Sequence, residues 1–253
     1  SVRLLVHPKL VDLVSGWYPE ASVEPLIALD CRGMAEFTNL DYHMPIGDLP
    51  AVFMDTPDKL QNRRVRFMRS DPSFRNTILE TMNWSSESII VGVSWRSSHV
   101  DVSRSNAYIG VQMLEFVKNN LPTNVQLMCL QYRLTDDERT VLDELGVYIP
   151  AVDFFNEVLL HGKYVGICDF VITPGTFIKQ LAGLFDVPTL SWGENGWSSL
   201  GRREYPWYRS IATLQIERDH SLSSLAYQLS RWLNIAIEHT FPKFNSSRES
   251  LLK

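Results

Sequence analysis

The sequence has few cysteines and no long apolar run. Its 253 residues include only Cys31, Cys129 and Cys168, which are far apart, and no Cys-x-x-Cys pair occurs. A small, odd and scattered set argues against a disulfide framework or a cysteine zinc site, and predicts buried thiols in a reducing compartment. No stretch is long and apolar enough to span a bilayer, and the N-terminus shows no signal-peptide pattern. We therefore expect a cytoplasmic protein without a membrane span.

An excess of positive charge is also missing. The formal net charge is −5, which predicts no nucleic-acid partner and no attraction to a membrane surface. One basic run contains Arg63, Arg64, Arg66 and Arg69. Such a run is more often a solvated face than an anion-binding edge.

Several nucleotide and nucleophile motifs are absent as well. The chain has no G-x-G-x-x-G, no G-x-x-x-x-G-K-[ST] and no complete nucleophile elbow, because Gly92 to Arg96 lacks the second glycine. His99 and Asp101 are too weak a pair to predict a metal site. These absences disfavour dinucleotide binding, P-loop chemistry and serine hydrolysis.

The second half of the chain instead alternates strands with helices. Short β-branched apolar runs predict strands, and segments with helical periodicity lie between them. The predicted strands are 89–95, 125–130, 147–149, 169–173 and 187–192, and the predicted helices are 108–119, 135–146, 153–165 and 176–185. With right-handed crossovers this pattern gives an α/β fold with a doubly wound, Rossmann-like parallel sheet.

The length allows one large or two modest domains, at about 150 residues per domain. The polar stretch Trp84–Ser88 predicts a boundary. We therefore expect a partial N-terminal α/β domain at 1–85, with strands at 3–6 and 23–29 and a Pro-rich loop at 41–50. A Rossmann-like domain would follow at 86–220. A C-terminal part at 221–253 would carry an apolar-striped helix at 222–239.

In such sheets ligands bind at the carboxyl ends of strands, where the strand order reverses. With the common order 3-2-1-4-5, the crevice lies between the first strand, which ends in Ser94-Trp95-Arg96, and the fourth, which ends in Thr173-Pro174-Gly175-Thr176. The N–H groups of a helix that begins at Thr176 and Phe177 can hold a diphosphate, and Gly175 allows close approach. Arg96 would neutralise it from across the crevice. The alternative is an ordinary turn with a Thr N-cap.

Three further residues have two interpretations each. Lys179, about one turn into that helix, either reaches a phosphate or is simply exposed. Gln131 and Tyr132 follow the second strand, and they either hold a base or ribose or are ordinary loop residues.

Five motifs in a fixed order then suggest a family. They are Tyr42–Pro50, Val91–Arg96, Leu130–Tyr132, Asp169–Gly183 and Tyr205–Tyr208. Together they resemble the glycosyltransferase-like region that follows tetratricopeptide repeats in many bacterial proteins. That region is similar to the ADP-heptose heptosyltransferases and, more distantly, to O-GlcNAc transferase. The resemblance covers roughly residues 40–215.

The resemblance implies a GT-B fold and an inverting, metal-independent transfer of a sugar from a nucleotide diphosphate sugar to an acceptor hydroxyl. It implies no cofactor beyond the donor substrate. A glycan or protein would be the acceptor, with an upstream helical-repeat region and a final helix that packs back toward the N-terminal domain. His43, in a loop that the resemblance places near the interdomain cleft, is the candidate base, and its alternative is a structural hydrogen bond in that Pro-rich loop. Arg104, on the loop after the first predicted strand, is a second phosphate candidate, and its alternative is an exposed loop charge.

The sequence departs from the family pattern at two positions. Relatives often have an Asp and a His where this chain has Gly175 and Gln180. A degenerate, non-catalytic binding module is therefore the main alternative function. A nucleotide-sugar epimerase with the same two-domain architecture is a weaker one.

Overall fold

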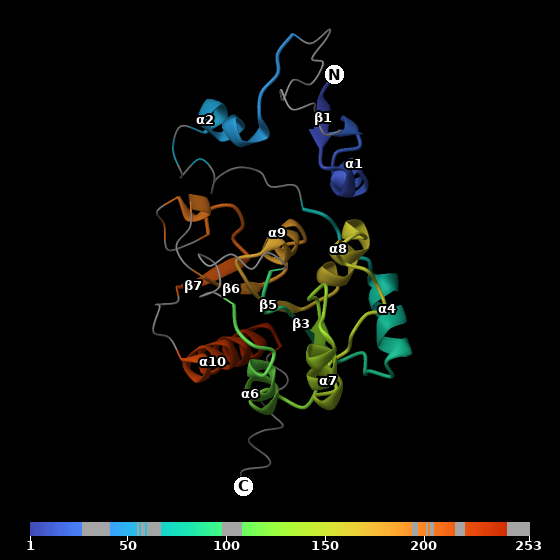
Figure 1. Cartoon of the computed structure of the whole chain (residues 1–253), viewed down its shortest axis with the longest axis vertical. Helices are drawn as coiled ribbons and strands as arrows, with labels where there is room; N and C mark the ends of the chain where they lie inside the picture. The colour runs from blue at the N-terminus through green and yellow to red at the C-terminus, as the bar shows by residue number, and fades with distance from the viewer. Residues whose placement is uncertain are drawn as a thin grey trace.

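The computed structural model describes residues 1–26, 41–54, 56, 59, 67–97, 108–193, 197–200, 202, 205–215 and 221–241. It shows a five-stranded sheet between two layers of helices, with a smaller two-stranded unit at one end (Figure 1). Arg104 and the 63–66 part of the basic run lie outside the described residues.

The main sheet is parallel throughout, as the apolar strand sequences predicted. Its order is β4-β3-β5-β6-β7. The strands are β3 (Ile89–Val93), β4 (Val125–Cys129), β5 (Phe170–Pro174), β6 (Thr189–Gly193) and β7 (Ile211–Gln215). The order reverses between the neighbours β3 and β5, which are the first and fourth predicted strands. The predicted reversal point of the strand order is therefore confirmed, and the ligand crevice at this point stays a prediction.

The edges of the sheet differ from the prediction. The expected strand 147–149 is reduced to a single bridge between Met128 and Tyr148, because the chain turns away at Pro150. It still lies outside β4, where the order 3-2-1-4-5 places it. On the opposite edge β7 was not predicted, since its sequence Ile-Ala-Thr-Leu-Gln has only a weak alternation.

Helices cover both faces of this sheet, so the doubly wound α/β prediction is confirmed. One face carries α6 (Met113–Asn119), α7 (Asp136–Glu144) and α10 (Leu222–Thr240), and the other carries α4 (Pro72–Thr81), α8 (Val158–Gly166) and α9 (Phe177–Leu184). Fully buried Trp95 and Trp192 lie in the first layer, at the carboxyl ends of β3 and β6.

Two helices begin later than their periodicity predicted. α6 starts at Met113 instead of residue 108. α8 starts at Val158 instead of residue 153, because the Asp153 carboxylate accepts hydrogen bonds from the Phe155 N–H and the Asn156 amide and so stabilises a turn. Local side-chain bonding competes here with helix formation.

The N-terminal part forms a parallel pair of strands with short helices. These are β1 (Arg3–Val6), β2 (Ser22–Pro25), η1 (Pro8–Leu10), α1 (Val11–Trp17), η2 (Ile46–Asp48) and α2 (Leu49–Phe53). The predicted loop 41–50 thus contains helical turns. α1 packs on α8, where Leu13 joins the apolar layer. The division at residue 85 stays a prediction.

α10 packs along α6 and contributes Leu225, Leu229, Leu233 and Ile237 to the layer beneath the sheet. Figure 1 shows it on the face opposite α9. Among the described residues, its observed contacts are therefore with the Rossmann-like part.

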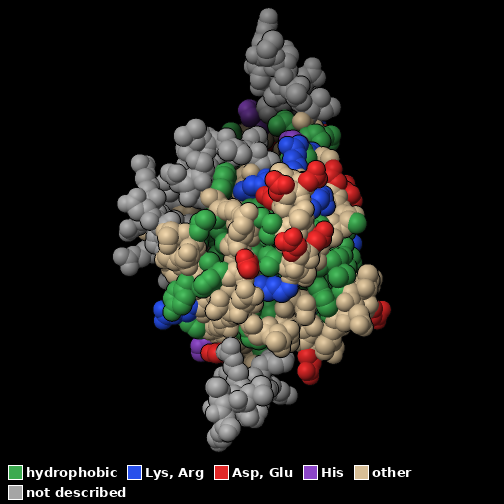
Figure 2. Space-filling view, turned by 60° about the horizontal axis from the view of Figure 1, so that its bottom comes forward, with side chains coloured by type: hydrophobic (Ala, Val, Ile, Leu, Met, Phe, Trp, Pro, Cys, Tyr) green, Lys and Arg blue, Asp and Glu red, His purple; other side chains and the backbone are tan. Residues whose placement is uncertain are grey.

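The described surface in Figure 2 carries acidic and basic side chains mixed together, which fits the small net charge. No described helix combines the length and apolarity that a membrane crossing needs.

Candidate functional site

The carboxyl ends of β3 and β5 are joined by a chain of hydroxyl groups. Ser94 Oγ and Thr173 Oγ1 lie 2.6 Å apart, and Thr173 Oγ1 lies 3.2 Å from Thr176 Oγ1. Ser94 and Thr173 are fully buried. These bonds tie the reversal point of the sheet to the first residue before α9. The alternation of β5 predicts which face of the sheet Thr173 occupies. Its hydrogen-bond partners, Ser94 and Thr176, are apparent only from the fold.

The turn between β5 and α9 leaves the helix start open. Thr176 is the N-cap of α9, but its side chain makes no capping bond to the helix. The N–H groups of the first turn therefore keep their partial positive charge for another acceptor. Phe177, the first helical residue, is 38% exposed beside them. Pro174, the residue before the turn, ends β5.

Gly175 is not required by the fold. Its φ lies outside the positive region that favours glycine, and a Cβ built on it would meet only the Trp192 carbonyl oxygen, at 3.9 Å. Its N–H donates to that same oxygen at 3.0 Å. Neither backbone conformation nor packing therefore explains a glycine at this position. The backbone at the start of α9 can therefore be approached closely from the Gly175 side.

Arg96 lies on the other side of the crevice and is paired within the protein. Its Nε and Nη2 donate to Glu138 at 2.7 and 2.6 Å, and Nη2 also donates to the Arg133 carbonyl at 2.8 Å. The hydrogen bond to Glu138 raises the pKa of Arg96 further. We expected Arg96 to face Gly175, whereas the structure directs most of its donors to α7.

Glu138 holds three elements together. It accepts from Arg96 and from the Trp95 indole N–H at 2.7 Å, and it completes a capping box with Thr135. Burial acts to raise the pKa of Glu138, but the hydrogen bonds from Arg96, Thr135 and Trp95 outweigh it and leave that pKa below its usual value. The sequence showed the capping box but gave no signal for the contact with Arg96.

Gln131 positions the backbone after β3. Its Oε1 accepts the N–H groups of Trp95 and Arg96 at 3.3 and 3.2 Å, and its Nε2 donates to the Tyr132 carbonyl. The side chain is buried. Both the oxygen and the nitrogen of the amide bind backbone groups within the protein. Gln131 therefore holds the backbone after β3 in place, and its observed bonds are all structural.

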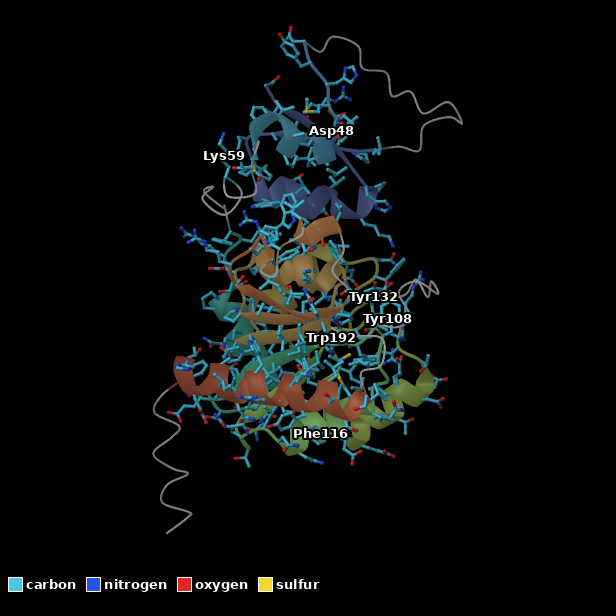
Figure 3. All side chains as sticks on the ribbon, turned by 90° about the vertical axis from the view of Figure 1, so that its left-hand side faces the viewer. Asp48, Lys59, Tyr108, Phe116, Tyr132 and Trp192 are labelled. Atoms are coloured by element: carbon cyan, nitrogen blue, oxygen red, sulfur yellow. The ribbon has the colours of Figure 1, made fainter. Side chains whose placement is uncertain are left out.

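Tyr132 lines a pocket of about 300 Å³ at the carboxyl end of β4. This is the lower end of the size range of ligand pockets. The other lining residues are Cys129, Gln131, Arg133, Leu134, Arg139, Ile149, Pro150, Val152, Asp153 and Phe154. Figure 3 shows Tyr132 and Tyr108 on the same side of the molecule. The pocket lining includes aromatic and charged side chains, and a role of Gln131 and Tyr132 in holding a base or ribose stays a prediction.

Lys179 is buried, so its alternative interpretation as an exposed lysine is wrong. Its Nζ lies 3.6 Å from the centre of the Tyr205 ring, and the neighbouring Gln180 donates to the Tyr205 hydroxyl at 2.7 Å. Burial lowers the pKa of Lys179 to about 8. Tyr205 lies in the Tyr205–Tyr208 motif but was not among the predicted site residues.

His43, the predicted base, lies on an exposed segment before η2. Its role, like the role of Arg104 outside the described residues, stays a prediction. Within the described ranges no three His, Cys, Asp or Glu side chains gather in a way that could hold a metal ion.

Protein FlbA of Caulobacter vibrioides is 22% identical to this chain over 236 residues, which cover 86% of the chain and 38% of FlbA. No protein-family profile matches the chain. At this identity the similarity to FlbA does not define a family.

Solved glycosyltransferase structures overlap the fold loosely. Escherichia coli heptosyltransferase WaaC with an ADP-heptose analogue has a TM-score of 0.42 at 11% identity, covering 66% of this chain and 49% of WaaC. E. coli heptosyltransferase II has a TM-score of 0.47 at 8% identity, covering 69% and 54%. EarP, described in arginine glycosylation of elongation factor EF-P, has 0.39 at 12%, covering 91% and 87%. The chain thus spans 38% of FlbA and about half of each heptosyltransferase, and no residue role is transferred from these proteins.

Proposed function

We propose that this chain is the donor-binding part of a metal-independent GT-B glycosyltransferase, which transfers a sugar from a nucleotide diphosphate sugar to an acceptor hydroxyl with inversion. The observation that carries this proposal is Gly175, a glycine that the fold does not require, directly in front of an uncapped helix start. Room for a close approach and free backbone donors are what a diphosphate needs. The order of the five family motifs along the chain supports the same assignment.

The phosphates would bind at the start of α9. The N–H groups of the first turn and the Thr176 hydroxyl would donate to phosphate oxygens, and the helix dipole would favour their negative charge. When the sugar leaves, negative charge develops on the diphosphate. The same donors would then stabilise the transition state.

The base and ribose would lie along the carboxyl edge toward β4. The pocket at Tyr132 opens on this side of the crevice, and its volume of about 300 Å³ suits part of a nucleotide. Arg96 is held on Glu138. We therefore assign it to the wall between the pocket and the crevice, and we assign Lys179, in the first turn of α9, as the source of positive charge for the phosphates.

Our proposal for acceptor binding rests on the resemblance to the glycosyltransferase-like region. His43 would serve as the base for the acceptor hydroxyl, and a glycan or protein segment would bind between the two parts of the GT-B fold. A helical-repeat region upstream would help to hold a protein acceptor.

Calorimetry with UDP-, GDP-, ADP- and CMP-linked sugars tests this proposal. We expect one of them to bind, and Gly175→Val to weaken that binding at least tenfold without lowering the melting temperature, because the added methyl groups fill the approach to α9. Gly47→Val is the matched control, since a Cβ at Gly47 meets nothing within 4 Å and one at Gly175 meets only the Trp192 carbonyl oxygen at 3.9 Å, while Gly47 lies in η2, away from α9. If no nucleotide sugar binds the wild-type chain, the proposal fails.

A non-catalytic binding module is the second candidate. It is favoured by Gln180, whose amide donates to Tyr205 where relatives carry an imidazole. Nucleotide-sugar binding without release of free nucleoside diphosphate, measured with the glycan and protein acceptors of the full-length protein, would favour this module. Release of the diphosphate would establish transfer.

A further inference from the structure

Lys179 is a buried cation that has no counter-ion among the described residues. The residue is only 6% exposed. Among the residues that the structure describes, no carboxylate forms an ion pair with it. Its charge rests on the face of the Tyr205 ring, 3.6 Å from the ring centre. A cation–π contact is a weaker partner for a desolvated ammonium than an anion is.

Lys179 lies in the first turn of α9. It is the third residue of the helix, and helical side chains lean toward the N-terminus of their helix, which is the side of Gly175 and Thr176. Tyr205 is fixed beside it, because Gln180 donates to the tyrosine hydroxyl at 2.7 Å. The ring and the amine are therefore held together one turn from the proposed phosphate site.

The sheet below this turn offers more hydroxyl groups without partners. Ser191 Oγ on β6 and Thr213 Oγ1 on β7 are buried and make no hydrogen bond within the described structure. Ser191 is the register partner of both Thr173 and Thr213, so the three hydroxyl groups form a row on one face of the sheet. This is the α9 face, because the alternate residues Leu190 and Trp192 belong to the opposite layer.

We propose that Lys179 selects donors that carry a second phosphate group, and that Tyr205 holds its amine until that phosphate displaces the ring. This inference rests on the proposed function and adds a specificity-determining residue to it. A monophosphate would be bound by the start of α9 alone. A diphosphate would also give the Lys179 ammonium a charged partner in place of the ring. The buried hydroxyl row makes this side of the turn polar enough to accept the displaced amine and the phosphate oxygens.

Calorimetry with matched pairs of nucleotides tests the inference: ADP and AMP, UDP and UMP, GDP and GMP. For the base that binds, we expect the wild-type chain to prefer the diphosphate by at least tenfold. In Lys179→Met the preference should fall below threefold, with the affinity for the monophosphate unchanged. Lys163→Met, which removes an exposed lysine from α8, should keep the wild-type preference.

Nuclear magnetic resonance gives a second readout that a purely structural lysine would not change. In the free protein the Tyr205 ring current should shift the Lys179 methylene signals upfield. Addition of the diphosphate should remove this shift, and addition of the monophosphate should leave it in place. Tyr205→Phe keeps the ring and should show the same response, whereas Tyr205→Leu should lack the shift from the start.

The outcomes separate the two proposals. If Lys179→Met keeps the preference for the diphosphate, or if the ring-current shift survives diphosphate binding, this inference is overturned and the proposed function stands. Absence of binding by every nucleotide and nucleotide sugar in the wild-type chain would overturn both.

Discussion

Arg96 and Lys179 lie on the two sides of the proposed crevice, and they differ in the partners that they have within the protein. Arg96, after β3, is neutralised by Glu138 at 2.6 Å and also donates to a backbone carbonyl. Lys179, in α9, has an aromatic ring as its partner and a lowered pKa. A cation paired with a carboxylate contributes little net charge to the crevice. A buried cation with no anion among the described residues pays a desolvation cost, and under our proposal its charge is available to a ligand.

The difference arises from the neighbouring helices. α7 begins with three acidic residues, and its capping-box Glu138 points back toward the end of β3. α9 has no acidic residue in its first turn. We call the β4 side of the crevice, where Glu138 neutralises Arg96, the closed side. We call the β6 side, where the first turn of α9 carries no acid, the open side. Three substitutions test this comparison.

Glu138→Ala should have the largest effect on stability, because it removes the anion from the closed side. The guanidinium of Arg96 and the indole N–H of Trp95 would lose their acceptor in a site where the Arg96 side chain is only 20% exposed. We expect the free energy of unfolding to fall by about 3 kcal/mol, measured by urea denaturation, because a partly buried charge is left unpaired.

The matched control is Asp137→Ala, which removes an exposed acid from the same helical turn. It changes the helix dipole interaction equally but leaves Arg96 paired, and should cost about 0.5 kcal/mol. Equal losses in the two variants would mean that the ion pair contributes nothing beyond the helix start.

Lys179→Met should act in the opposite direction and stabilise the protein. Desolvation of the ammonium lowers its pKa from 10.5 to about 8, a cost of about 3 kcal/mol in the folded state below pH 8. Loss of the contact with Tyr205 offsets about 1 kcal/mol of this. At pH 7 we therefore expect the variant to be more stable by about 2 kcal/mol in urea denaturation.

The pH dependence of this gain has a definite sign. Between pH 8 and pH 10.5 the unfolded chain binds the Lys179 proton and the folded chain has released it, so wild-type stability rises with pH in this window. The advantage of Lys179→Met should therefore fade as the pH approaches 10.5. Lys163→Met should be neutral throughout, and a destabilised Lys179→Met would show that the amine is already satisfied.

The two sides also differ in how far the sequence predicts them. Four of the five strands and the turn at Gly175 follow from local patterns, such as the apolar runs and the Pro-Gly-Thr that interrupts one of them. The reversal point follows from the common strand order of such sheets. The partners of Arg96 and Lys179 do not, because Glu138 and Tyr205 are 42 and 26 residues away along the chain. Sequence periodicity specifies which face a residue occupies. It does not specify which charged group it meets.

Phe155→Leu should have the smallest effect, and it tests the connection of the closed side to the N-terminal part. Lys9 Nζ lies 3.4 Å and Arg133 Cζ lies 3.6 Å from the centre of the Phe155 ring, so the two cations must occupy opposite faces of it. Lys9 belongs to η1, and the Arg133 carbonyl accepts from Arg96. Removal of the ring should lower the free energy of unfolding by about 1 kcal/mol.

A double-mutant cycle separates this contact from the loss of apolar surface. Lys9→Met should cost less in a Phe155→Leu background than in the wild type, by about 0.5 kcal/mol, because the ring that it contacts is gone. Phe116→Leu is the control, since Phe116 is 39% exposed on α6, far from η1 in Figure 3, and its cycle with Lys9→Met should be additive. Additivity in the Phe155 cycle as well would mean that the contact between Lys9 and the Phe155 ring does not couple the N-terminal part to the β4 side of the crevice, and that the packing of α1 and η1 on α8 holds the N-terminal part instead.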